Sequence, residues 1–104
     1  MKYIVIGLGF FGSKCASILT SMGHEVLGID NDLEILEEYK ESFTSVMKMD
    51  ATSINAVKTL PLHDVDAAIV AIGEDVGASI LALSILKNLK VKRIIGRAIN
   101  EIHH

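Results

Sequence analysis

Short apolar runs alternate along the whole chain with longer segments in which apolar residues recur at helical spacing. The first run, Tyr3 to Ile6, is rich in β-branched residues and is followed by a glycine, which is typical of a strand. The next segment has the spacing of a helix and ends at Gly23. Its apolar positions are Phe11, Cys15, Ile18, Leu19 and Met22. The opening of the chain therefore predicts one strand followed by one helix.

The same alternation continues to the end of the sequence. Further strands are predicted at Glu25–Asp30, Ser45–Met49, Ala67–Ala71 and Arg93–Arg97, and helices around Leu33–Tyr39, Ser53–Thr59 and Asp75–Leu89. Short strands that alternate with helices, across connections too long for hairpins, predict βαβ units and a parallel sheet with right-handed crossovers. We therefore expect a single α/β domain over residues 1–104. It would be a Rossmann-like, doubly wound parallel sheet of about five strands that lacks the sixth strand.

The last predicted helix carries two apolar stripes. The first stripe contains Ala78, Ala82, Ile85 and Leu89, and the second contains Val76, Ile80 and Leu83. We expect one stripe to pack on the sheet. Small monomers rarely expose a wide apolar patch, so the second stripe needs cover from a partner or from another part of the same domain.

Composition and charge exclude several classes of protein. The chain has 13 acidic and 10 basic side chains and a net charge of −3, which is the wrong sign for binding a phosphate backbone, so nucleic acid is not an expected partner. The longest uncharged apolar stretch, Val76 to Leu86, is much shorter than the roughly 20 residues of a membrane-spanning helix. The chain also opens on a strand pattern rather than a signal peptide. We expect a cytoplasmic protein, in which the single cysteine, Cys15, is a small buried apolar group.

A glycine motif lies between the first strand and the first helix. The segment Gly7-Leu8-Gly9-Phe10-Phe11-Gly12 has the GxGxxG spacing in the strand-turn-helix context of a dinucleotide-binding loop. There, the first glycine permits the tight turn, the second lets the backbone approach a phosphate, and the third allows close packing of the helix. Free amides at the helix start would face the anion. The alternative is a glycine turn without a ligand.

A triphosphate-binding loop of the GxxxxGK[ST] type fits the same segment less well. Ser13 occupies the position of the lysine in that motif, and Lys14 is followed by Cys15 rather than by a hydroxyl residue. The phosphate-binding amine and the magnesium ligand would both be misplaced. A nucleoside triphosphatase is therefore disfavoured.

Asp30 ends the second predicted strand, 18 residues after Gly12. At this distance a carboxylate accepts hydrogen bonds from the adenosine ribose hydroxyls. A 2′-phosphate would face this charge, and Asn31 and Asp32 follow without an arginine, so NAD or an adenine mononucleotide is favoured over NADP. The alternative is that Asp30 only caps the next helix, a task that Asp32 or Asn31 could also perform.

Together with further motifs, these residues resemble the RCK domains, also called KTN or TrkA-N domains, of bacterial Trk and Ktr potassium-uptake systems and of ligand-gated potassium channels. The further motifs are Gly23-His24-Glu25-Val26 leading to Asp30, Asp50-Ala51-Thr52, Val70-Ala71-Ile72-Gly73, and Arg97 and Asn100 with the pair His103-His104. The last group resembles the fifth strand and the start of the crossover helix of the family. The resemblance covers the whole chain.

The resemblance implies a regulatory domain without catalytic residues or a metal site. Such domains dimerise, assemble into cytoplasmic rings that are often octameric, and dock on an integral-membrane potassium transporter or channel subunit at the inner face of the cell membrane. Nucleotide exchange in the ring then gates transport, and the family ligands include ATP, ADP, NAD and NADH. The implied nucleotide-binding residues are Gly7, Leu8, Gly9, Phe10, Phe11, Gly12, Asp30, Asn31, Asp50, Ala51, Thr52, Ala71, Ile72, Gly73 and Arg97.

One position departs from the family pattern. Phe10 stands where members that respond to ATP commonly carry arginine, and losing one charge-assisted phosphate contact would cost about 1.5 to 3 kcal/mol. A pyrophosphate can be held by backbone amides and the helix start alone. We therefore rank NAD, NADH, ADP and AMP above ATP.

Two other functions stay open at this point. One is the NAD-binding domain of an oxidoreductase that lacks its substrate domain. The other is a Rossmann module that only mediates assembly. The four histidines, His24, His63, His103 and His104, are scattered in predicted turns or at the end of the chain and form no catalytic arrangement with a nucleophile.

Overall fold

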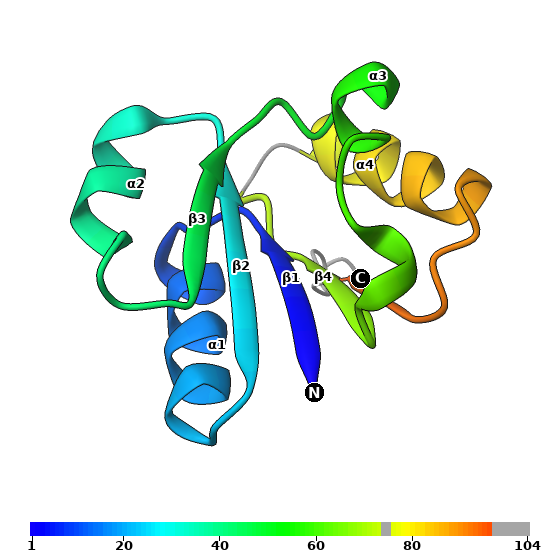
Figure 1. The fold of residues 1–104 in the computed structure, drawn as a ribbon. Helices are drawn as coiled ribbons and strands as arrows, with labels where there is room; N and C mark the ends of the chain where they lie inside the picture. The colour runs from blue at the N-terminus through cyan, green and yellow to red at the C-terminus, as the bar shows by residue number, and fades with distance from the viewer. Residues whose placement is uncertain (74–75, 97–104) are drawn as a thin grey trace, which may run out of the picture.

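Strands and helices alternate along the chain in the computed structural model, which describes residues 1–73 and 76–96 (Figure 1). The described strands form one parallel sheet in the order β3-β2-β1-β4-β5. Their bounds are β1 (Lys2–Ile6), β2 (Glu25–Asp30), β3 (Ser45–Lys48), β4 (Ala67–Val70) and β5 (Ile94–Gly96). The helices are α1 (Phe10–Ser21), α2 (Leu33–Tyr39), α3 (Ile54–Val57) and α4 (Val76–Asn88), with a 3-10 turn, η1, at Leu62–Asp64. The predicted α/β fold with its parallel sheet is confirmed.

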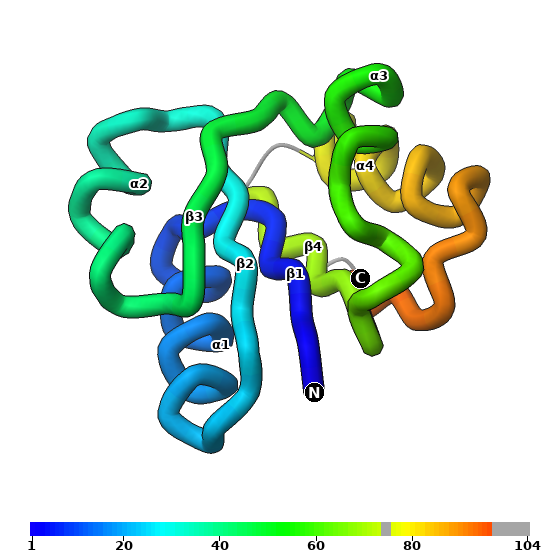
Figure 2. Tube along the Cα trace, viewed as in Figure 1, coloured from blue at the N-terminus to red at the C-terminus, as the bar shows by residue number. Residues whose placement is uncertain are grey.

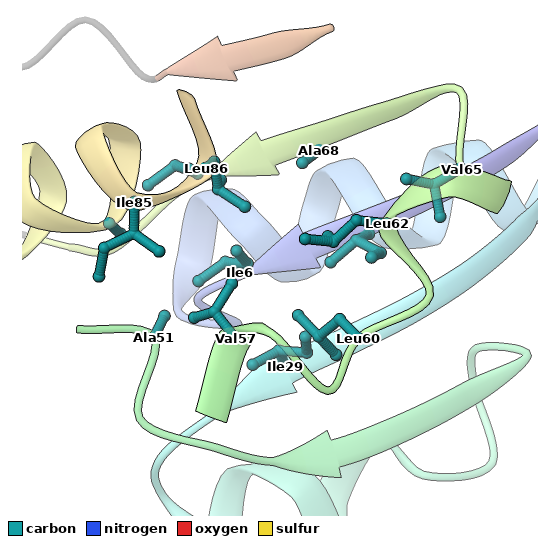
Figure 3. Close-up of a cluster of buried hydrophobic side chains, with 13 residues drawn as sticks. Ile6, Ile29, Ala51, Val57, Leu60, Leu62, Val65, Ala68, Ile85 and Leu86 are labelled. Carbon is teal, nitrogen blue, oxygen red and sulfur yellow. The ribbon is translucent and has the colours of Figure 1, made fainter. Parts of the chain in front are cut away.

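The sheet separates two layers of helices (Figure 1). On one face, α1 and α2 pack over alternate strand residues such as Val5 and Val26. On the other face, α3, η1 and α4 cover Ile4, Ile6 and Ile29. Figure 3 shows this second cluster, in which side chains from β1, β2, α3 and α4 converge. Both faces of the central strands are therefore covered, which explains why all four residues of β4 are buried.

Apart from Leu19, which packs against the core, the apolar positions that indicate α1 in the sequence contribute little to its buried face. Ile18 and Met22 are 56% and 64% exposed, whereas Gly12, Ser13 and Ala16 are buried. The helix starts so close to the loop that follows β1 that a Cβ at Gly12 would overlap the carbonyl oxygen of Gly7. Only small residues fit at such a contact.

The prediction that Cys15 is buried is wrong, because the structure leaves its side chain half-buried. Cys15 lies on a flank of α1, beside the small residues that face the sheet. Which side of α1 faces the sheet is set by the small residues that allow its close approach. The spacing of the apolar residues in α1 does not reveal this side.

The two apolar stripes predicted on α4 differ in burial. Ala82 and Ile85 of the first stripe are buried against the core, as expected. In the second stripe Val76 and Ile80 are exposed, while Leu83 is half-buried beside Gly96 of β5. The described part of the chain thus leaves one apolar face of α4 uncovered. None of its helices is long and apolar enough to cross a membrane.

Candidate functional site

The carboxyl ends of four strands meet at one edge of the sheet, because β3, β2, β1 and β4 are parallel neighbours. The chain leaves β1 toward β2 on one side, while β4 pairs with β1 on the other, which makes this edge a topological switch point. A cavity of about 430 Å³ opens there. Its lining residues are Ile6, Gly7, Gly9, Ile29, Asp30, Asn31, Ile35, Met49, Asp50, Ala51, Thr52, Ala71, Ile72, Gly73 and Ala78.

Most of the residues that the sequence assigns to nucleotide binding lie together in this cavity. The segment after β3 also contributes lining residues. Figure 2 shows that the connection from β3 to α3 passes the upper ends of β2 and β1. The predicted residues that line the cavity are Gly7, Gly9, Asp30, Asn31, Asp50, Ala51, Thr52, Ala71, Ile72 and Gly73. The tertiary structure thus gathers four separate segments at one edge.

Other predicted residues lie elsewhere. Leu8 is buried in the core under α1, and Gly12 is packed against the glycine loop. The Phe10 ring is 84% exposed, and neither it nor Phe11 lines the cavity. Arg97 lies outside the described residues.

Five apolar residues that were not predicted from the sequence complete the cavity: Ile6, Ile29, Ile35, Met49 and Ala78. Ile6 ends β1, and Ile29 lies next to the end of β2. Ile35 comes from the first turn of α2, Met49 follows β3, and Ala78 lies in the first turn of α4. Their positions beside strand ends and helix starts are the available signal, since the loops at that edge of an α/β sheet carry ligand sites.

The glycine loop has a closed part and an open part. Gly7 adopts a φ of +98°, and a Cβ there would lie 2.6 Å from the carbonyl oxygen of Ala71. Gly9, at the N-cap of α1, has no heavy atom within 4 Å of the position of its missing Cβ. The backbone at Gly9 is therefore open to a ligand. The N-terminal end of α1 lies here, and the helix dipole favours an anion at this end.

The Asp30 carboxylate joins the glycine loop to the end of β2. Its Oδ2 accepts a hydrogen bond from the Leu8 amide at 2.8 Å, and its Oδ1 accepts one from the Asp32 amide at 2.9 Å. Asp32, not Asp30, caps α2, because its side chain accepts from the Glu34 amide at 2.9 Å. Each carboxylate oxygen has a further lone-pair site, so Asp30 can hold the loop and still accept a ribose hydroxyl.

A second carboxylate, Asp50, lies at the β3 end of the cavity. Its Oδ1 accepts hydrogen bonds from the Thr52 hydroxyl at 2.6 Å and from the Thr52 amide at 2.9 Å. These bonds, the hydroxyl first and the amide second, lower the pKa of Asp50 below its ordinary value. Asp50 is therefore ionised at neutral pH.

The side chains in the cavity give it a negative electrostatic character. Among its described lining residues are two carboxylates and no lysine, arginine or histidine. The nearby Lys14 ammonium instead lies over the Phe10 ring, 5.9 Å from its centroid, and does not line the cavity. Anionic groups of a ligand would therefore be held by backbone amides, and each additional ligand charge would be poorly compensated.

Comparison with known sequences identifies the family of the chain. Residues 3–104 match the family model of the TrkA-N domain. The Ktr system potassium uptake protein C of Bacillus subtilis is 39% identical over 102 residues, which are 98% of this chain and 46% of that protein. The Ktr system potassium uptake protein A of the same organism is 37% identical over 103 residues, 99% of this chain and 46% of that protein. The chain spans about half the length of these curated relatives.

Solved structures share the fold. The NAD(P)-binding domain of an exopolyphosphatase-related protein from Archaeoglobus fulgidus superposes with a TM-score of 0.84 at 27% identity, over 92% of this chain and 71% of that one. The Kef C-terminal domain of Shewanella denitrificans, solved in an AMP-bound form, has a TM-score of 0.75 over 96% of this chain and 60% of that one. Its sequence is 18% identical, so this second likeness shows the fold alone.

Proposed function

The chain belongs to the TrkA-N domain family, and from this premise we propose that it is a nucleotide-binding regulatory domain of a potassium transport system. It would act in the cytoplasm on an integral-membrane transporter or channel subunit, and it would carry out no reaction of its own. The observation that carries the proposal is the cavity, in which an open Gly9 backbone, the start of α1 and the Asp30 carboxylate lie together. This combination suits an adenosine ribose joined to a phosphate group.

The proposed ligand is an adenine nucleotide with a free 2′-hydroxyl. Asp30 would accept hydrogen bonds from the ribose, and a 2′-phosphate would meet the charges of Asp30 and Asp50. The absence of a basic side chain among the described lining residues favours ligands with few phosphate charges. NAD, NADH, AMP and ADP therefore rank above ATP, and NADP ranks last.

Binding of the nucleotide is proposed to regulate a homodimer and a larger ring, of which an octamer is one form. The exposed apolar face of α4, with Val76, Ile80 and Leu81, supplies a surface for such contacts. Different nucleotides would favour different geometries between subunits. A coupling of about 1 to 3 kcal/mol per site, repeated around a ring, is enough to bias a gate.

The nucleotide proposal is tested by calorimetric titration with NAD, NADH, NADPH, AMP, ADP and ATP. Binding of NAD and AMP with little binding of NADPH is expected. A ligand at 100 times its dissociation constant should also raise stability by about 2.7 kcal/mol in a thermal-shift measurement. Failure of every adenine nucleotide to bind would contradict the proposal and favour a module that only mediates assembly.

The assembly proposal is tested by light scattering coupled to size-exclusion chromatography. The chain should run as a dimer or larger species, and Ile80→Glu should shift it toward the monomer, because burying a charge in an apolar contact is costly. Asn88→Glu, which changes an exposed residue at the other end of the same helix, is the matched control. A wild-type chain that is monomeric at all concentrations, with and without nucleotide, would overturn this part of the proposal.

A further inference from the structure

A buried hydroxyl group lies behind the β4 end of the cavity. Ser79, in α4, is 4% exposed and donates a hydrogen bond from its Oγ to the carbonyl oxygen of Ile72 at 3.0 Å. Ile72 belongs to the segment after β4 that lines the cavity. The bond ties this segment to the helix that follows it. Neither the glycine motif nor the Asp30 region of the sequence points to this serine.

We propose that Ser79 is a positioning residue, which holds the segment 71–73 in place as the subsite for the second half of a dinucleotide. The inference rests on the proposed function, since it assumes that the cavity binds an adenine nucleotide. It adds that the cavity has two ends, one at Asp30 and one at the segment after β4. It also assigns to Ser79 a selective effect on dinucleotides.

The order of the strands sets this division. Along the edge of the sheet, the segments follow the order β3, β2, β1 and β4, so Asp50 and Asp30 lie at one end, Gly9 in the middle and Gly73 at the other end. A nucleoside on Asp30 with its phosphate at the start of α1 occupies the first two positions. AMP stops there, whereas NAD continues beyond its pyrophosphate. Only the dinucleotide would reach the segment after β4.

The segment after β4 is held on two sides. On one side it touches the glycine loop, where a Cβ at Gly7 would lie 2.6 Å from the Ala71 carbonyl oxygen and 2.9 Å from the Ile72 nitrogen. The Ala71 amide also donates to the Ile6 carbonyl oxygen at 2.7 Å. On the other side Ser79 holds the Ile72 carbonyl group. Loss of the Ser79 hydroxyl would remove the contact with α4, while the contacts with the glycine loop and Ile6 would remain.

Gly73 offers an independent probe of the same subsite. It lines the cavity, and, apart from its chain neighbours, no heavy atom of the described residues lies within 4 Å of the position that its Cβ would occupy. Among the described residues a side chain there would have room near its Cβ, and it would occupy space in the cavity. Gly73→Val therefore tests whether a ligand uses this end.

The experiment measures the affinities of NAD and AMP by calorimetry for the wild-type chain, Ser79→Ala, Ser79→Thr, Gly73→Val and Ser84→Ala. Ser84 is an exposed serine of the same helix and is the matched control. Ser79→Ala should weaken NAD binding by about three- to tenfold, because NAD would have to order the freed segment without the Ser79–Ile72 hydrogen bond, and one such bond usually accounts for a change of this size. AMP binding should weaken by less than about twofold. Ser79→Thr, which keeps the hydroxyl, should restore NAD binding. Gly73→Val should weaken NAD binding at least as much and spare AMP.

The outcomes separate the two proposals. If the wild-type chain binds both ligands and Ser79→Ala affects them equally or not at all, the role of Ser79 is overturned while the nucleotide proposal stands. If the wild-type chain binds neither ligand, both proposals fail. Should alanine prevent folding, as judged by circular dichroism, Ser79→Cys takes its place, because it preserves the volume and weakens the donor. The same selective loss of NAD binding is then expected.

Discussion

The glycines beside the cavity at the carboxyl edge of the sheet form two contrasting pairs. At Gly7 and Gly12 the space of the missing side chain is filled by atoms of the protein itself, from the segment after β4 and from the glycine loop. At Gly9 and Gly73 the described residues other than the chain neighbours leave the same space empty, and both glycines line the cavity. The fold therefore requires the first pair, while the second pair leaves room for something that is not part of the chain. The comparison teaches that one short motif contains both glycines that the packing requires and a glycine that it does not require, and the latter is the one available to a ligand.

The largest effect on stability is expected from a substitution in the first pair, Gly7 and Gly12. Gly12→Ala would place a Cβ on the Gly7 carbonyl oxygen and force α1 away from the sheet. Overpacking typically costs about 1 to 3 kcal/mol, and we expect the upper end of this range because the obstacle is backbone. Urea denaturation should show this loss, and Gly9→Ala should not. Equal stability of Gly12→Ala and the wild-type chain would contradict the distinction between the pairs.

The second prediction concerns the open pair. Gly9→Ala meets no protein atom, and Gly9 has an ordinary extended backbone with φ −69°, so stability should stay within about 0.5 kcal/mol of wild type. The added methyl group would block the approach of a phosphate to the backbone amides. Calorimetry should show that NAD and AMP bind at least about tenfold more weakly, the usual effect of losing a charge-assisted hydrogen bond. Unchanged affinity would mean that no phosphate approaches Gly9.

Asp30 combines a structural role, as acceptor for the Leu8 amide, with the proposed binding role, as acceptor for the ribose. Asp30→Ala removes the acceptor for the Leu8 amide and the proposed acceptor for the ribose. We expect stability to fall by about 1 to 2 kcal/mol and the affinity for NAD and AMP to fall by about tenfold. Asp32→Ala is the control: it removes the cap of α2, at a cost of about 1 kcal/mol, and should leave affinity unchanged. Equal nucleotide affinities for the two variants would disprove the ribose role.

The smallest effect is expected at the β3 end of the cavity. In Thr52→Val the hydroxyl donor to Asp50 is lost and the amide donor remains, so the pKa of Asp50 should rise toward its ordinary value. Because that pKa is lowered in the folded chain, the associated stability is present above the ordinary pKa of the carboxyl and is lost as the pH falls through the lowered value. Carbon-13 NMR titration of the Asp50 carboxyl group measures the shift. Thr59→Val, which removes a hydroxyl bonded to Ala56, should leave the titration unchanged.

Much of the site follows from local sequence. The glycine motif after a strand, Asp30 at the end of the next strand and Asp50-Ala51-Thr52 after the third are each placed by their position relative to one element. Parallel pairing then brings all of them to the same edge. That step needs only the alternation of strands and helices, which is visible as periodicity in the chain.

The sequence by itself determined the α/β class, the order of the strands and α-helices along residues 1–96, and the segments that reach the cavity edge of the sheet, because periodicity and glycine spacing are local properties. It did not reveal η1 (Leu62–Asp64), where only a turn at Pro61 was predicted. The tertiary structure decided which face of α1 is buried, why Cys15 is only half-buried, and why Phe10 lies outside the cavity. It also decided that Asp30 holds the Leu8 amide. These features depend on how closely segments distant in the chain approach one another, and that distance is set by packing across the sheet.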